Sequence, residues 1–188
     1  MNPPTHLIDF LEQQLGTMAG GQIFESEPER RVQVARFENQ PVPDSVTYVT
    51  TGISKHFLHQ ASGPEIKLEL LACVWSRFRN AGIDALLFAL SQEILSLHHA
   101  PAHGDVIGPR GPITDGSKLE AFYILPPLYH EEAMEAFESE GTQTLFAWAL
   151  PISVAEASFI RREGWKAFEE RIHSTDPDLM DLERASIV

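Results

Sequence analysis

Four segments of the chain place their apolar residues three or four positions apart, as one face of an α-helix does. They cover residues 7–15, 83–97, 131–139 and 153–172. The longest apolar stripe consists of Ile83, Leu86, Leu87, Leu90, Ile94 and Leu97. The last segment opens with a capping box, in which Ser153 and Glu156 can each accept a hydrogen bond from the other's backbone N–H. We therefore predict helices at all four places, and either the last helix or a second one after Gly164 buries Phe159, Trp165, Phe168 and Ile172.

Other stretches have the short apolar or alternating patterns of β-strands. They cover residues 32–37, 46–51, 66–70, 119–125 and 144–150, with a short extended piece at 105–107. Residues 66–70 alternate strictly and predict a half-buried strand, whereas residues 144–150 are apolar on both faces and predict a strand covered on both sides. The order helix, strands, helix, strands, helices predicts one domain of the α+β (mixed α/β) class. We expect a central, mostly antiparallel or mixed sheet flanked by helices in a sandwich-like arrangement.

The composition agrees with a globular domain, but the charge is unusual. The 188 residues are 43% hydrophobic and 22% charged, and 27 Asp and Glu against 14 Lys and Arg give a net charge of −13. Binding to nucleic acid needs a basic surface, so we expect no nucleic-acid partner. Residues 129–188 hold 13 of the acidic residues and only five basic ones. Such a field speeds association with a cationic partner, although solubility alone is the commoner reason for an acidic protein.

Three glutamates are the candidate partner-binding residues. The helix predicted over residues 131–139 places Glu131, Glu135 and Glu138 at i, i+4 and i+7, on the face opposite Met134 and Phe137. Like charges at this spacing repel one another, so the stripe does not stabilise its own helix and a cationic partner would relieve the repulsion. A solvated helix face explains the same pattern, and both interpretations stay open.

Residues with catalytic or metal-binding chemistry are few. His98, His99 and His103 lie within six positions, but neither a His-Glu-x-x-His motif nor a cysteine pair accompanies them. We expect surface or helix-capping roles for them, and no metal or cofactor. The single Cys73 stands in an apolar run and is expected to be a small buried residue rather than a nucleophile. An enzyme that uses the three histidines is the least favoured alternative.

The ends and the hydropathy of the chain bear on where it is located. The N-terminus lacks a basic segment followed by an apolar core, and no run approaches the ~20 apolar residues of a membrane span. Together with a single cysteine, these features predict a cytoplasmic protein that does not bind a membrane.

Several segments resemble, in their order and spacing, the suppressor-of-fused domain family. They are residues 46–54, 65–70, 103–107, 119–127, 150–153 with Glu156, and 177–184. The resemblance covers residues 28 to 186, so we expect residues 28–188 to form a suppressor-of-fused-like domain and residues 1–27 to add an N-terminal helix and connector to it. It implies an α/β sandwich-like domain without established catalytic residues.

The same resemblance implies a binding role. The larger eukaryotic members hold a transcription factor between two lobes, whereas small stand-alone bacterial members are regarded as immunity proteins that neutralise toxins of polymorphic toxin systems. This chain is too short for a second lobe, so we expect the second role, with a cognate toxin domain that has a basic face as the partner. A regulator or scaffold resembling the eukaryotic members is the alternative.

Overall fold

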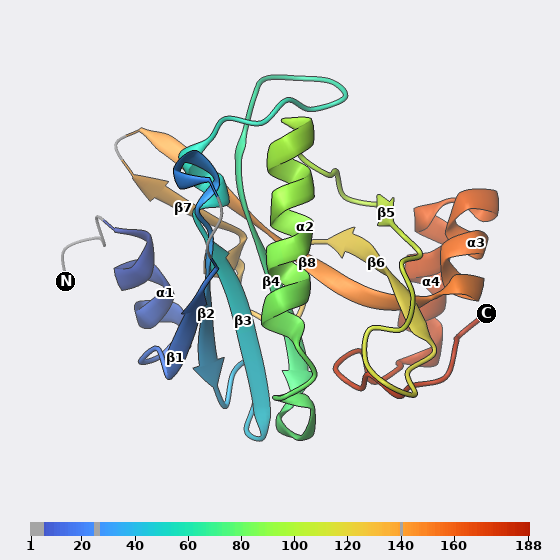
Figure 1. Ribbon diagram of the computed structural model, residues 1–188. Coiled ribbons are helices and arrows are strands. Elements are labelled where there is room, and N and C mark those ends of the chain that lie inside the picture. Colours follow the sequence, from blue (N-terminus) through green and yellow to red (C-terminus); the bar gives the residue numbers. More distant parts are fainter. Residues whose placement is uncertain (1–5, 25–26, 140) are drawn as a thin grey trace.

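The computed structural model describes residues 6–24, 27–139 and 141–188. The expected N-terminal unit of residues 1–27 lies partly outside this range, because residues 1–5 and 25–26 are not among those described. In the described part, eight strands form one mixed sheet and four α-helices pack around it (Figure 1). The predicted α+β class with a central mixed sheet is confirmed.

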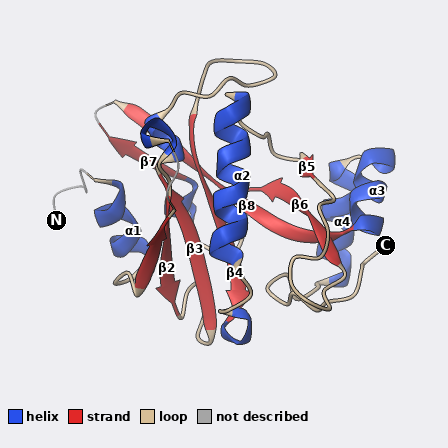
Figure 2. Cartoon of the chain, viewed as in Figure 1, coloured by secondary structure: helices blue, strands red, loops and turns tan. Residues whose placement is uncertain are grey.

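Most elements lie where the hydrophobic pattern predicts them (Figure 2). The strands are β1 (Gly20–Ile23), β2 (Gln33–Glu38), β3 (Ser45–Thr51), β4 (Lys67–Trp75), β5 (Val106–Ile107), β6 (Leu119–Leu125), β7 (Ala136–Ser139) and β8 (Thr142–Ser153). The helices are α1 (Leu7–Leu15), α2 (Ile83–Leu97), α3 (Val154–Glu163) and α4 (Trp165–Thr175). Short 3₁₀ turns are η1 (Pro28–Arg30), η2 (Ile53–Lys55), η3 (Ser76–Phe78) and η4 (Glu132–Glu135).

Strand β8 is the centre of the sheet. The strand order is β1-β2-β3-β4-β8-β6-β5, and β7 also pairs with β8. All pairs are antiparallel except β4 with β8, which is parallel. On the side away from β4, the first part of β8 pairs with β7 and the last part pairs with β6. One strand therefore organises three neighbours.

The helices cover the sheet with apolar side chains. Helix α2 lies across β3 and β4 (Figure 1) and buries Ile83, Leu87, Leu90 and Ile94, whereas Leu97 in its last turn is 67% exposed, contrary to the predicted stripe. Helix α1 places Phe10 between the rings of Phe137 and Phe146, at centroid distances of 5.0 and 5.8 Å. Helices α3 and α4 pack at the other end, near β6 (Figure 1). No described helix is both long and apolar enough to cross a membrane.

The helix predicted for residues 131–139 is wrong. Glu132–Glu135 form one 3₁₀ turn, and Ala136–Ser139 form strand β7, which makes an antiparallel hairpin with the start of β8. Gly141 has a positive φ of 73°, which suits the tight turn between the two strands. Met134 and Phe137 are buried as expected, because both backbone conformations can turn these two side chains inward. Pairing with β8 decides between them.

Two further differences concern strands. Strand β1, which begins at the Gly20-Gly21 pair and pairs with β2 at the edge of the sheet, is not among the predicted strands. Its residues are exposed or half-buried, so no apolar pattern marks it. Residues 66–70 were expected to form a half-buried strand, but β4 lies between β3 and β8 and buries every residue from 68 to 74, including Glu69.

Phe168→Ala should destabilise the protein by about 3–5 kcal/mol, because it removes a fully buried aromatic side chain. The ring of Phe168 meets Tyr123 edge to face at a centroid distance of 5.3 Å and holds α4 on β6. Urea denaturation gives the change in the free energy of unfolding. Phe57→Ala is the matched control, since that ring is 50% exposed. An equal decrease in the free energy of unfolding for the two variants would contradict the packing described for α4.

Candidate binding surface

An apolar groove of about 340 Å³ opens beside the middle of β8. Its residues come from β4, β6, β7 and β8, from the loops before β4 and after α2, and from the segment between β6 and β7. They are Gln60, Ile66, Leu68, Pro101, Ala102, His103, Ile124, Leu125, Pro126, Pro127, Glu135, Ala136, Gln143, Leu145, Phe146 and Ala147. Most are apolar, and none is a lysine or an arginine.

The groove exists because β8 changes its partner. The pairing with β7 ends where Ala136 faces Leu145, and the pairing with β6 begins where Leu125 faces Trp148. Between these points, Phe146 and Ala147 have no partner in either register on that side. Residues 126–135 lead from β6 to β7 and do not close the gap as a strand would. The small side chain of Ala147 leaves the hollow open.

The three acidic candidates, Glu131, Glu135 and Glu138, lie just before η4, at its end and in β7. Glu131 precedes η4, Glu135 is its last residue, and Glu138 is in β7, so the three do not form the predicted helical stripe. All three are exposed, as is Glu132. Of the four, only Glu135 lines the groove. The groove therefore has an apolar floor and one carboxylate at its rim, with further carboxylates nearby in the sequence.

His103 also lines the groove and makes a polar contact that the sequence did not predict. Its Nε2 lies 2.6 Å from Oε1 of Glu169, and the hydroxyl of Tyr123 donates to the same oxygen at 2.8 Å. The ring of Trp165 lies 4.5 Å from the imidazole. A Cβ at Gly104 would come within 2.6 Å of Trp165, so this close packing requires glycine. One carboxylate oxygen of Glu169 therefore contacts both His103 and Tyr123.

The other two histidines of the predicted cluster lie apart from His103. His98 ends α2 in a left-handed conformation, and its Nδ1 is 3.1 Å from the carbonyl oxygen of Leu95, which confirms the helix-capping role. His99 forms an isolated β-bridge with His59. Within residues 6–24, 27–139 and 141–188, no three histidine, cysteine or acidic side chains are grouped to hold a metal ion.

Cys73 is buried, as expected, and it has a histidine neighbour. Nε2 of His130 lies 4.0 Å from Sγ of Cys73 and 3.4 Å from the hydroxyl of Thr47. Burial raises the pKa of the Cys73 thiol to about 12 and lowers the pKa of His130 to about 4. Both groups are therefore neutral near pH 7. A cysteine nucleophile needs the opposite shift, so this pair is packed as part of the core.

Glu69 is a fully buried carboxyl group that holds the turn after β3. Its Oε1 accepts hydrogen bonds from the backbone N–H groups of Gly52 and Ser54 and from the Ser54 hydroxyl, at 2.6–3.0 Å. The hydroxyl of Thr50 donates to Oε2 at 2.7 Å. Burial raises the pKa of Glu69, and these donors partly oppose the rise. The alternating pattern gave no sign of this role, because a charged residue in such a strand is normally expected to face water.

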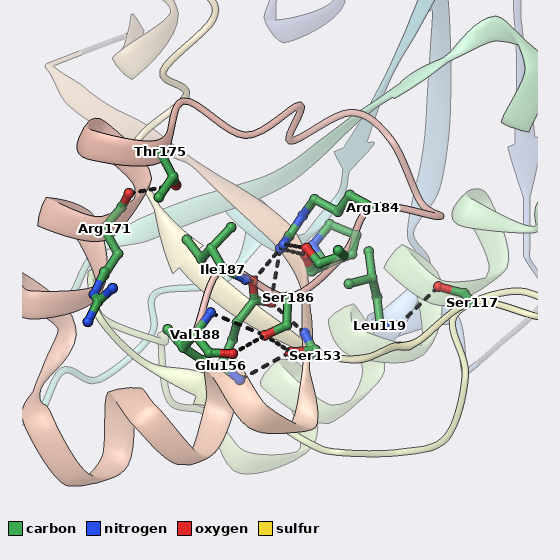
Figure 3. Close-up of polar contacts among 12 residues, drawn as sticks. Ser117, Leu119, Ser153, Glu156, Arg171, Thr175, Arg184, Ser186, Ile187 and Val188 are labelled. Carbon is green, nitrogen blue, oxygen red and sulfur yellow. Dashed lines mark hydrogen bonds and ion pairs between the residues drawn. The ribbon is translucent and has the colours of Figure 1, made fainter.

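A buried ion pair holds the C-terminal segment (Figure 3). Arg184 donates from Nη1 to Oε1 of Glu156 at 2.6 Å and from Nη2 to Oε2 at 3.0 Å, and Nη2 also reaches the carbonyl oxygen of Pro151. Glu156 completes the predicted capping box with Ser153, which is confirmed. Its Oε1 also accepts from the N–H of Ile187 at 3.2 Å. One carboxylate thus joins the start of α3 to the last residues of the chain.

The family model described as Suppressor of fused protein (SUFU) matches residues 28–185. The chain belongs to this family. A relative from Bacillus subtilis (strain 168), described as Immunity protein YqcF, is 24% identical over 163 residues, which cover 84% of this chain and 82% of the relative.

Solved structures share the SUFU fold. A crystal structure described as that of a SUFU homologue from Neisseria gonorrhoeae FA 1090 has a TM-score of 0.72 at 18% identity and covers 96% of this chain and 93% of that one. A chain of the Sufu-Fu complex has a TM-score of 0.71 at 14% identity, with 99% and 93% covered. Drosophila Suppressor of Fused has a TM-score of 0.62 at 13% identity, and the match covers 82% of this chain but 42% of the fly protein.

The segments that suggested the SUFU family meet at two places in the structure. Residues 103–107 and 119–127 contribute His103 and the Pro126-Pro127 pair to the groove. Residues 150–156 and 177–184 contribute Glu156 and Arg184 to the buried ion pair. The first place is open at the surface, whereas the second is buried.

Arg184→Met should lower the free energy of unfolding by about 3–5 kcal/mol, because it leaves the Glu156 carboxylate buried without its cation. Arg77→Met is the matched control. Arg77 pairs with Asp181 at 2.8 Å, but its side chain is exposed, so its loss should cost much less free energy of unfolding. Urea denaturation of both variants measures the difference. A similar decrease in the free energy of unfolding for both variants would mean that burial does not make the Arg184–Glu156 pair more important than the Arg77–Asp181 pair.

Glu69→Gln should remove a pH dependence of stability without unfolding the protein. The pKa of Glu69 is raised in the folded state, so its stabilising contribution is full below the unfolded carboxyl pKa of about 4.3 and declines as the pH rises through the folded pKa. Relative to Glu69→Gln, the parent protein should therefore lose stability as the pH rises from about 4.5 to 8. The measurement is the free energy of unfolding of both proteins across this range. A constant difference, or one that grows with pH in favour of the parent, would contradict the raised pKa.

Proposed function

We propose that this protein is a non-catalytic, immunity-type binding protein, which neutralises a cognate toxin domain of a polymorphic toxin system by covering part of its surface. The observation that carries the proposal is the match to Immunity protein YqcF over more than four-fifths of both chains. The Sufu-Fu complex also shows that this fold occurs in a protein–protein assembly. The binding function is a proposal for this chain, and we place it in the cytoplasm, where such a toxin would act.

The groove and the charge of the chain support a basic protein partner. The groove presents apolar surface next to Glu135, and a net charge of −13 steers cationic proteins toward the chain. We propose that Glu131, Glu135 and Glu138 lie in or beside the interface. Their different backbone settings mean that they would act as separate rim charges, not as one helical stripe. No nucleic acid or membrane is needed for this role.

Two other functions fit parts of the structure less well. A regulator or scaffold that resembles the eukaryotic family members would use the same kind of surface, and only the identity of the partner separates it from an immunity protein. An enzyme would have its best starting point in His103, which Glu169 orients at the groove. One stoichiometric zinc ion in the purified protein would favour the enzyme.

The immunity role can be tested by co-expression. The probe is the C-terminal domain of the protein encoded directly upstream of this gene in the source genome, expressed in a bacterial host with and without this chain. We expect that domain to stop growth when expressed alone and co-expression of this chain to restore growth. Arrest that persists although both proteins are present and folded would contradict the proposal, and so would an upstream protein without toxic activity.

The charge of the interface gives a further prediction. Changing Glu131, Glu135 and Glu138 together to Lys should slow association with the basic partner about tenfold or more at low salt, because steering depends on opposite charge. The effect should shrink at high ionic strength. Stopped-flow mixing measures the association rates, and circular dichroism checks the fold.

The control for that triple variant changes the net charge equally at other places. Glu29, Glu163 and Glu170 are exposed residues of η1, α3 and α4. Their replacement by Lys should slow association less than the first variant does. Equal rates for the parent and the first variant at both ionic strengths would remove these glutamates from the interface.

A further inference from the structure

We infer that the groove beside β8 binds one large apolar side chain of the partner, carried on a segment that places lysine or arginine next to it. This inference rests on the proposed function, because it specifies the part of the partner that the binding protein holds. It assigns a place and a chemistry to an interaction that the family membership leaves open.

The floor of the groove selects an apolar group. Leu68, Ile124 and Ala147 are buried side chains of three adjacent strands, and Ile66 and Leu145 are half-buried beside them. A volume of about 340 Å³ is at the lower end of the size of ligand pockets and is enough for a tryptophan or another large side chain. A charged or amide group on this floor would lose its hydration without a polar partner, which costs free energy. Apolar hollows of this kind hold the aromatic anchors of protein interfaces.

The rim selects the residues beside the anchor. Glu135 is the acidic residue among those that line the groove, and the described lining residues include no lysine or arginine. His103 and Glu169 already contact each other through Nε2 and Oε1, so that imidazole nitrogen is occupied. A cation next to the anchor would therefore meet the Glu135 carboxylate, for which the described residues show no ion-pair partner, and no lysine or arginine of the described lining.

The charge of the whole chain distinguishes between possible occupants. A second copy of this chain would also carry a net charge of −13, so self-association would bring two acidic surfaces together. A basic segment of another protein reverses that repulsion into attraction. We therefore commit to a cationic segment of the partner as the occupant.

The test uses three short capped peptides as probes. Lys-Ser-Trp-Ser-Lys contains the anchor and the cations, Glu-Ser-Trp-Ser-Glu keeps only the anchor, and Lys-Ser-Ser-Ser-Lys keeps only the cations. We expect the first to shift the NMR signals of the methyl groups of Ile66, Leu145 and Ala147 in the parent protein, with a dissociation constant on the order of 1 mM. The other two should bind at least about tenfold more weakly. Equal binding of all three peptides, or shifts confined to other methyl groups, would overturn the inference.

Two substitutions connect the signal to the groove. Ala147→Phe fills the hollow and should abolish the shifts at Ile66 and Leu145. Because a larger side chain at this site could disturb the fold, Glu135→Lys provides a second test at the exposed rim. Glu135→Lys should weaken binding of the first peptide at least about fivefold and leave the circular dichroism spectrum unchanged. Glu29→Lys, with the same change of charge on η1, should leave peptide binding near the parent value. Unchanged binding in both groove variants would overturn the inference.

The growth assay separates this inference from the proposed function. If Ala147→Phe is folded and restores growth as well as the parent does, the groove does not hold the partner, although the immunity role stands. If the parent itself fails to restore growth while the first peptide still binds at the groove, the immunity role is wrong and the preference of the groove stands.

Discussion

The burial of β8 on both faces is the constraint on which the rest of the structure depends. This strand has twelve residues, and nine of them are buried, namely Thr144 and every residue from 146 to 153. A buried strand must have its backbone groups hydrogen-bonded, so β8 needs neighbours along its length. Strand β4 pairs with β8 on one side. On the other side, the shorter strands β7 and β6 pair with different parts of β8. The groove is the place where neither of these two strands reaches.

Buried and exposed carboxylates have different roles in this acidic chain. Glu69 and Glu156 are completely buried, and each accepts several hydrogen bonds that hold a turn or the C-terminal segment in place. A buried carboxylate without such partners would be strongly destabilising. Glu131, Glu135 and Glu138 are exposed, so they cost the fold little and remain available to a partner. The net charge therefore describes the surface, whereas single buried carboxylates determine local structure.

Much of the fold could be predicted from local patterns because the longer elements bury a whole face. The stripe of α2, the alternation or apolar runs of β3, β6 and β8, and the capping box at Ser153 each carry a signal that neighbouring residues repeat. Strand β1 has no such signal, since its two glycines and its exposed residues pair only through the backbone. Residues 131–139 have a signal that suits two conformations, and pairing with β8 selects the strand. Boundaries and short elements were thus harder to predict than long buried ones.

The sequence by itself determined the class of the fold, its SUFU-like order of segments, and the acidic character of the surface, because periodicity, motif spacing and charge are properties of the chain. Only the tertiary structure decided that His103 meets Glu169 instead of His98 and His99, that Arg184 pairs with Glu156, and that Ala147 lines the groove where β8 changes its partner. The residues of each contact are far apart in the chain, or their surroundings depend on the register of neighbouring strands. Register and packing depend on the sum of contacts across the whole sheet, so no local pattern could reveal the groove.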